Sequence, residues 1–313
     1  MQTRAALPLF LLALYGCAPS EDSHAKAIIG AVLIDGAGGP PLTNSMVVVS
    51  EGRIREAGRH GEIPVSAEAN KIDGAGKFIV PGLVDVYPHA APDVSFQAQG
   101  APATAEEARA RIAAIAARSG AQQKPAAIQV WPAGMPAAIV EALLEAARGA
   151  GIPIAGHPVS QADAQLLVQN GASTLTGMIR DTEALDPALV DRLRDLRIVY
   201  APALSAIPAG AELERARHNT TRLFAAGVPL AMASSGGDPI HECELLAEAG
   251  VPPLDVIVAA TSDGARALGQ SEERGAIQAG KRADLLLLLA NPGEDIRNLR
   301  RLDRRMTAGE WAP

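Results

Sequence analysis

Short apolar runs and longer periodic runs divide the chain into three parts. Between residues 27 and 80, β-like runs such as Met46-Val47-Val48-Val49 are separated by Asp-Gly, Gly-Gly-Pro-Pro and Glu-Gly turns, a pattern typical of a small sheet. From Glu106 onward, helical runs alternate with short apolar strands, which predicts parallel βαβ units in an α/β barrel or an open doubly wound sheet. The leucines at 285–289 are too few for a helix and fit a strand buried on both faces.

The middle part contains the clearest individual elements. Thr104 can cap a helix over 105–117, and Glu107, three residues later, completes a capping box. The pattern then predicts a helix at 136–148 and strands at 126–131, 152–155, 173–175, 198–200 and 228–232. Two β-rich ends beside an α/β middle predict a composite β-sandwich domain from residues 26–80 and 275–313, next to a barrel of residues 81–274.

The first residues are typical of an export signal. Residues 1–16 contain Arg4, then an apolar stretch, then the small Gly16. The sequence Leu14-Tyr15-Gly16-Cys17 resembles the bacterial lipoprotein box, which implies acylation of Cys17 and a polar tether over 17–25 that holds an exported domain at a membrane of the cell envelope. An ordinary cleaved signal peptide is the alternative. If Cys17 is acylated, Cys243 is a free thiol, which we expect to be buried.

Composition and charge narrow the class of protein. The 313 residues are 48% hydrophobic and 20% charged, which excludes a disordered chain, a coiled coil and a collagen-like repeat. Lys and Arg total 28 against 35 Asp and Glu, a net charge of -7. Because nucleic acids bind basic surfaces, we expect no nucleic-acid partner.

Several motifs, in order, resemble one enzyme family. Pro81-Gly82-Leu83-Val84-Asp85-Val86-Tyr87-Pro88-His89 is similar to the first barrel strand of the metal-dependent amidohydrolase superfamily, whose relatives include imidazolonepropionase and prolidase. The segment 275–285 is similar to that family's closing G-x-I-x-x-G-K-x-A-D-L motif. The resemblance implies a TIM-type barrel and hydrolysis of non-peptide carbon–nitrogen bonds by a metal-bound water, with cyclic amides or dipeptide-like compounds as substrates.

The metal ligands that the resemblance implies are mostly replaced. The remaining ligands are His89 after the first strand and His157 after the fifth, a vestigial pair. The replaced positions carry Tyr87, Gln129 in place of a carboxylated lysine, Gly177 in place of a histidine and Ser235 in place of the catalytic aspartate, although Lys124 lies close to the lysine position. Catalytic zinc sites generally have three protein ligands, so we expect no metal, or one weakly held divalent ion, zinc if any, and activity lost or much reduced.

Asp238, His241 or Glu242, which follow the eighth strand, could supply replacement ligands. One rival hypothesis is therefore an active mononuclear hydrolase built from His89, His157 and Asp238 or His241. A serine triad of Ser235, His157 and Asp238 is conceivable, but the G-x-S-x-G elbow is missing. Another rival is a non-catalytic envelope lipoprotein that binds a small molecule or a protein partner. A third is a chain damaged by deletion that folds poorly.

The barrel region is also short. Eight βα units need about 250 residues, and the interval between Val80 and Leu268 is shorter than that. The second and third strands, expected between His89 and Thr104, are predicted to be missing. A shortened or incomplete barrel leaves an unpaired edge, which a second copy of the chain could cover.

Overall fold

The computed structural model describes residues 25–87, 94–118 and 127–312. The predicted signal segment 1–16, Cys17, His89 and Lys124 lie outside these ranges. Of the predicted tether, the structure describes Ala25, which is buried and whose carbonyl accepts a hydrogen bond from the Asn70 N–H at 2.9 Å. The packed domain therefore includes the residue at which the tether was predicted to end.

Strands from both ends of the chain form one sheet, as predicted for a composite β domain. Its strands are β1 (Lys26–Leu33), β2 (Leu42–Ser50), β3 (Arg53–Arg59), β4 (Asn70–Asp73), β5 (Phe78–Pro81), β11 (Leu285–Leu288), β12 (Leu302–Thr307) and β13 (Glu310–Trp311). The order is β13-β12-β11-β5-β1-β2-β3, with β4 paired to β1. The apolar runs Ile28-Ile29 and Val32-Leu33 belong to a single strand, β1. Gly30 between them has a φ of 86°, and the pairing of β1 with β2 is irregular at this point.

The leucine run forms β11, which contributes side chains to the cores of both the β domain and the barrel. All four residues of β11 are buried, as predicted for a strand covered on both faces, but the fifth leucine of the predicted strand, Leu289, lies beyond β11 and is exposed. Leu285 and Leu287 pack with Ile79 in the core of the β domain, whereas Leu286 and Leu288 join the core of the barrel. The alternation of side chains along one strand thus connects the two cores.

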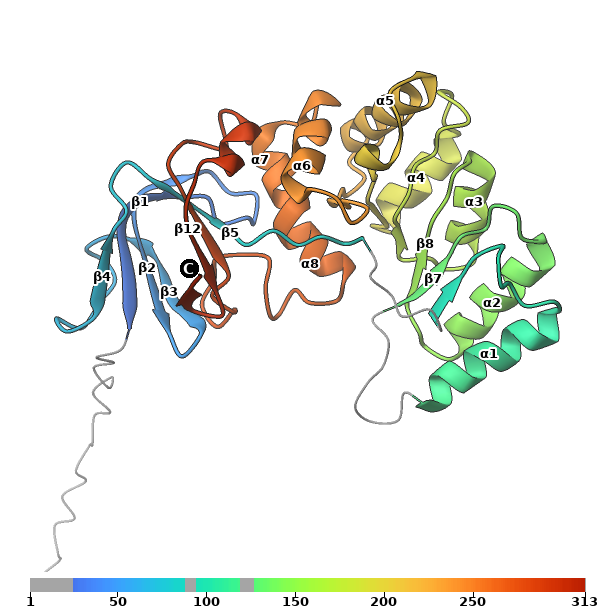
Figure 1. Ribbon diagram of the computed structural model, residues 1–313, viewed down its shortest axis with the longest axis horizontal. Helices are drawn as coiled ribbons and strands as arrows, with labels where there is room; N and C mark the ends of the chain where they lie inside the picture. Colours follow the sequence, from blue (N-terminus) through green and yellow to red (C-terminus); the bar gives the residue numbers. More distant parts are fainter. Residues whose placement is uncertain (1–24, 88–93, 119–126, 313) are drawn as a thin grey trace, which may run out of the picture.

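The barrel strands are very short and parallel. They are β6 (Ser95–Phe96), β7 (Ile128–Val130), β8 (Ile154–Gly156), β9 (Thr174–Leu175) and β10 (Val199–Tyr200), in the order β10-β9-β8-β7-β6. The helices are α1 (Ala105–Arg118), α2 (Ala137–Gly149), α3 (Gln161–Gln169), α4 (Pro187–Asp195), α5 (Ala211–Ala225), α6 (Pro239–Glu248), α7 (Pro253–Val258) and α8 (Gly264–Ala267), with short turns η2 (Leu204–Ala206), η3 (Ala259–Asp263) and η4 (Ile296–Arg300). Helices α6 to α8 lie between the β domain and the row α1 to α5 (Figure 1).

Two details of the barrel differ from the sequence prediction. A strand, β6, is present between His89 and Thr104, where none was expected; it pairs Ser95 with Gln129 of β7. Two residues are too few to produce a visible period, which is why the pattern missed it. The predicted strand at 228–232 is instead an extended segment, joined to β10 by one bridge between Tyr200 and Leu230.

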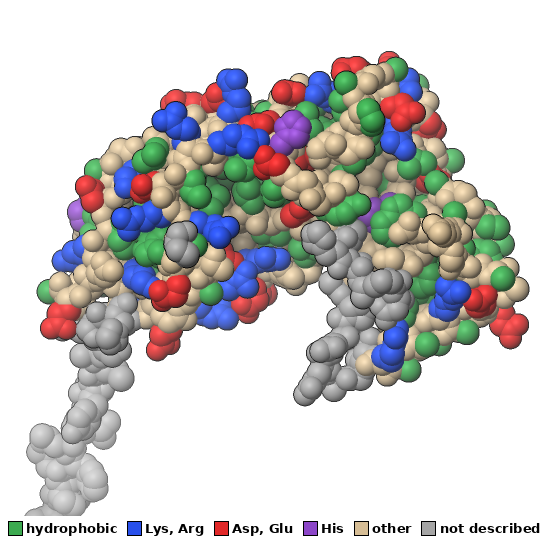
Figure 2. All heavy atoms as spheres, in the orientation of Figure 1, with side chains coloured by type: hydrophobic (Ala, Val, Ile, Leu, Met, Phe, Trp, Pro, Cys, Tyr) green, Lys and Arg blue, Asp and Glu red, His purple; other side chains and the backbone are tan. Residues whose placement is uncertain are grey.

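The first and eighth segments of the barrel lie together. The Val86 N–H donates to the Met232 carbonyl at 3.0 Å, and the Val84 N–H donates to the Ala260 carbonyl at 2.8 Å. Within the described ranges, no helix is long and apolar enough to span a membrane. Acidic and basic side chains are interspersed over the face shown in Figure 2, without a broad basic area on that face.

Candidate functional site

His157 is held at the end of β8 by the strand beside it. Its backbone N–H donates to the Val130 carbonyl at 2.8 Å, and its ring Nε2 lies 2.7 Å from Oε1 of Gln129 on β7. The parallel register that pairs Gln129 with Ala155 produces this contact. The residue in the family's lysine position is therefore bonded to the histidine that follows the fifth strand.

The His157 ring is shielded from water. It is 4% exposed and stacks on Trp131, with ring centroids 3.8 Å apart and planes 5° from parallel. Burial lowers the pKa of His157 to about 4, against the opposing effect of a backbone hydrogen bond at Thr176. At neutral pH the imidazole is uncharged, and where the proton is on Nε2 the ring donates to Oε1 of Gln129. In that tautomer Nε2 has no lone pair for a metal ion.

Asp85 connects the first segment of the barrel to the eighth. One carboxylate oxygen accepts from the Ser234 N–H at 3.0 Å and from the Tyr87 N–H at 2.9 Å, and the other accepts from the Ser234 hydroxyl. Sequence analysis treated Asp85 only as part of a motif. Both carboxylate oxygens accept hydrogen bonds from neighbouring groups, so Asp85 links the first barrel segment to Ser234 and has a structural role here.

Two of the replaced ligand positions have their own local geometry. Ser235 follows the buried Ser234 with a φ of 52°, a left-handed conformation that a non-glycine residue seldom adopts. At Gly177, an added Cβ would lie 2.8 Å from the Pro158 carbonyl oxygen. The neighbouring backbone would therefore have to move before a histidine could occupy that position.

Two of the predicted replacement ligands, Asp238 and His241, belong to a different cluster. Asp238 caps α6, accepting from the Ile240 N–H at 2.9 Å, and pairs with Arg300 Nη1 at 2.7 Å. His241 Nδ1 lies 3.4 Å from Glu244, which also pairs with Arg300 at 2.6 Å. These contacts lie between α6 and η4, whereas His157 is bonded to Gln129 and Val130 of β7. Over the described ranges, no three His, Cys, Asp or Glu side chains are grouped for metal binding.

Glu242, the third predicted replacement ligand, is buried, which the sequence did not predict. Both of its oxygens accept backbone hydrogen bonds at the start of η2, from the Leu204 N–H at 2.7 Å and from the Ser205 N–H at 2.9 Å. Burial raises the pKa of Glu242, although these hydrogen bonds favour the charged form. The next residue, Cys243, is a buried free thiol, as expected from the sequence, and burial raises its pKa.

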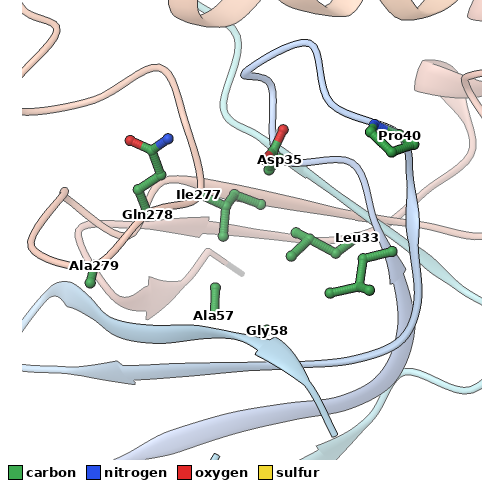
Figure 3. A pocket seen from close by; sticks show the side chains of 9 residues that line it. Leu33, Asp35, Pro40, Ala57, Gly58, Ile277, Gln278 and Ala279 are labelled. Carbon is green, nitrogen blue, oxygen red and sulfur yellow. The ribbon is translucent and has the colours of Figure 1, made fainter.

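A separate cavity lies in the β domain. It has a volume of about 300 Å³, and its walls include Leu33, Pro40 and Ile277, with Asp35 and Gln278 on one side (Figure 3). The walls contain no histidine, cysteine or serine that could act as a nucleophile. This cavity therefore does not belong to the chemistry at the end of the barrel strands.

Comparisons with known proteins agree with the motifs. The profile of the amidohydrolase family matches residues 70–311. Similar solved structures include a putative prolidase from Bifidobacterium longum, at 22% identity and a TM-score of 0.73 over 93% of this chain and 95% of that one. A Xaa-Pro dipeptidase (16%, TM-score 0.74, 92% and 99%) and phenylurea hydrolase B (19%, TM-score 0.74, 92% and 96%) are also similar. At these identities the structures show a shared fold.

The search of curated proteins found no match. The family profile covers most of the chain, from β4 to β13. The chain belongs to the amidohydrolase family, whose members are hydrolases of carbon–nitrogen bonds and typically bind a divalent metal.

Proposed function

We propose that this chain is an amidohydrolase-family protein in which metal-dependent hydrolysis is lost or much reduced. The observation that carries the proposal is the hydrogen bond between Gln129 and His157. In the family, these two positions supply metal ligands. Here they bind each other, and the imidazole is buried against Trp131.

The donor set of the described residues does not fit a catalytic metal. A neutral amide replaces the carboxylated lysine, the glycine at 177 offers no side-chain donor, and Ser235 offers a hydroxyl where the family has a carboxylate. Metal sites of this kind need deprotonated or neutral donors from at least three side chains. Asp238 and His241 are already paired with Arg300 and Glu244. His89 lies outside the described ranges, so the predicted pair of His89 and His157 stays a prediction.

The loss of the acid matters independently of the metal. A serine hydroxyl does not accept a proton near neutral pH as a carboxylate does. General acid–base catalysis typically contributes about 10²- to 10⁴-fold to the rate of an enzyme. With Ser235 in that position, turnover would be low even if a metal ion were present.

The proposal is tested by metal content and turnover measured together. We expect the purified exported domain to hold much less than one equivalent of zinc, and to hydrolyse neither a Xaa-Pro dipeptide nor a phenylurea, the substrates suggested by the similar structures. A His157→Ala variant serves as the matched control, because its metal content and turnover should equal those of the wild type. One full equivalent of zinc, with turnover that a chelator or His157→Ala abolishes, would instead establish the mononuclear hydrolase.

We also propose that the chain is exported and anchored through Cys17 to a membrane of the cell envelope. Because one acyl chain gives only marginal membrane binding, the anchor would need the additional chains that lipoprotein acylation supplies. We expect the full-length protein to fractionate with membranes and to enter the detergent phase, and a Cys17→Ser variant to become water-soluble. Cys243→Ser is the matched control, since that thiol is buried. Equal partitioning of wild type and Cys17→Ser would contradict the anchor.

A further inference from the structure

A second cavity, of about 380 Å³, lies where the barrel meets the β domain. The barrel contributes Arg197, just after α4, Asp263 at the end of η3 and Arg266 in α8. The segment leading to β11 contributes Arg274 and Lys281. Arg197 is therefore brought close to basic residues of the segment 266–281, which lies more than sixty positions later in the sequence.

The charges around this cavity are unbalanced. Four basic side chains line it, and Asp263 is the one carboxylate among the residues that line it. Asp263 pairs with Arg266 at 3.2 Å. Arg274 Nε donates to the Gln270 side-chain oxygen at 2.6 Å, and Lys281 Nζ donates to the Ser271 carbonyl, both neutral acceptors. The nearby acids are paired elsewhere, Glu273 with Arg53 and Asp284 with Arg282.

Arg266, Arg274 and Lys281 are also partly desolvated, whereas Arg197 is exposed. Nη2 of Arg266 is inaccessible to water and, in the described part of the chain, makes no hydrogen bond, although it lies 3.2 Å from Oδ1 of Asp263. Burial lowers the pKa of Arg274, and the nearby charge of Arg282 adds to this effect. Cations that share a cavity repel one another, and this repulsion costs folding free energy. An anion in the cavity would remove that cost.

We propose that this cavity is a binding site for a small doubly charged oxyanion, such as phosphate or a short dicarboxylate, held by Arg197, Arg266, Arg274 and Lys281. Guanidinium groups present paired N–H donors that match the oxygens of phosphate and carboxylate groups. A volume near 380 Å³ suits a small molecule. Because its walls come from both domains, the bound anion stabilises their contact.

The test is calorimetric titration of the whole exported domain with inorganic phosphate and, separately, succinate, at constant ionic strength, with chloride and acetate as monovalent references. We expect saturable binding of phosphate or succinate with a stoichiometry of one. Arg274→Gln should weaken that binding by about tenfold or more, as expected for the loss of one charge-assisted hydrogen bond. Comparison of the two dissociation constants shows whether the site prefers a phosphate group or a dicarboxylate.

Arg59→Gln is the matched control, since it removes the same charge from an exposed position on β3 that does not line the cavity. Phosphate also stabilises proteins non-specifically, but that effect would be equal in wild type, Arg274→Gln and Arg59→Gln. If Arg274→Gln fails to fold, the exposed Arg197→Gln replaces it. No saturable binding of either anion, or binding that survives Arg197→Gln and Arg274→Gln unchanged, would overturn the proposal.

Discussion

Replacing Glu242 with alanine is expected to lower the free energy of unfolding by on the order of 4 kcal/mol, because two buried backbone N–H groups lose a charged acceptor together. The side chain is fully buried and its oxygens bind the N–H groups of Leu204 and Ser205 at 2.7 and 2.9 Å. The hydrogen bond to Leu204 is buried and that to Ser205 is partly buried. Urea unfolding of the two proteins measures the difference.

The matched control for this prediction is Glu248→Ala on the same helix. Glu248 pairs with Arg217, but its side chain is 58% exposed, and exposed ion pairs contribute about 0–1 kcal/mol. A difference between the two variants of less than about 1 kcal/mol would contradict the structural role assigned to Glu242.

The raised pKa of Glu242 adds a dependence on pH. The folded protein holds the proton more tightly than the unfolded chain, so the contribution to stability is complete below the unfolded pKa of 4.5 and declines as pH rises through the folded pKa. Glu242→Gln cannot titrate. The wild type should therefore lose stability relative to Glu242→Gln as pH rises above 4.5, and a constant difference would count against this carboxylate as the cause.

Several strands of the β domain could be predicted from the sequence because their apolar runs are bounded by clear turn signals. Runs in β2 and β11 carried the apolar pattern, and glycine-containing turns gave their limits. The barrel was harder to predict in detail. Strands of two residues, such as β6 and β9, have no period of their own and exist only because parallel neighbours pair with them.

In the candidate site, the sequence predicted which residues occupy the ligand positions but not the contacts that they make. The positions of His157 and Gln129 could be assigned from the family motifs, but the bond between them depends on the register of β7 and β8. The burial of Glu242 could not be predicted either. Acids in the first turn of a helix are usually solvated, and the contact with η2 comes from a segment 37 or 38 positions away in the sequence.

The second large effect is expected at His157. Its pKa is lowered from 6.5 in the unfolded chain to about 4 in the folded protein. The unfolded chain therefore binds a proton first as pH falls, and stability that is complete above pH 6.5 declines until pH 4 is passed. The depression corresponds to roughly 3 kcal/mol in the free energy of unfolding. Relative to a His157→Gln variant, which cannot titrate, the wild type should lose about that amount between pH 6.5 and 4.

The direct measurement is the NMR titration of the His157 ring, whose midpoint should lie near pH 4. A bound metal ion would also suppress protonation, since the metal and the proton compete for the same nitrogen. Chelation separates the two causes. If burial against Trp131 and the bond to Gln129 hold the ring neutral, a chelator leaves the midpoint unchanged. A midpoint that rises toward 6.5 after chelation would show that a metal ion, and not desolvation, keeps the imidazole uncharged.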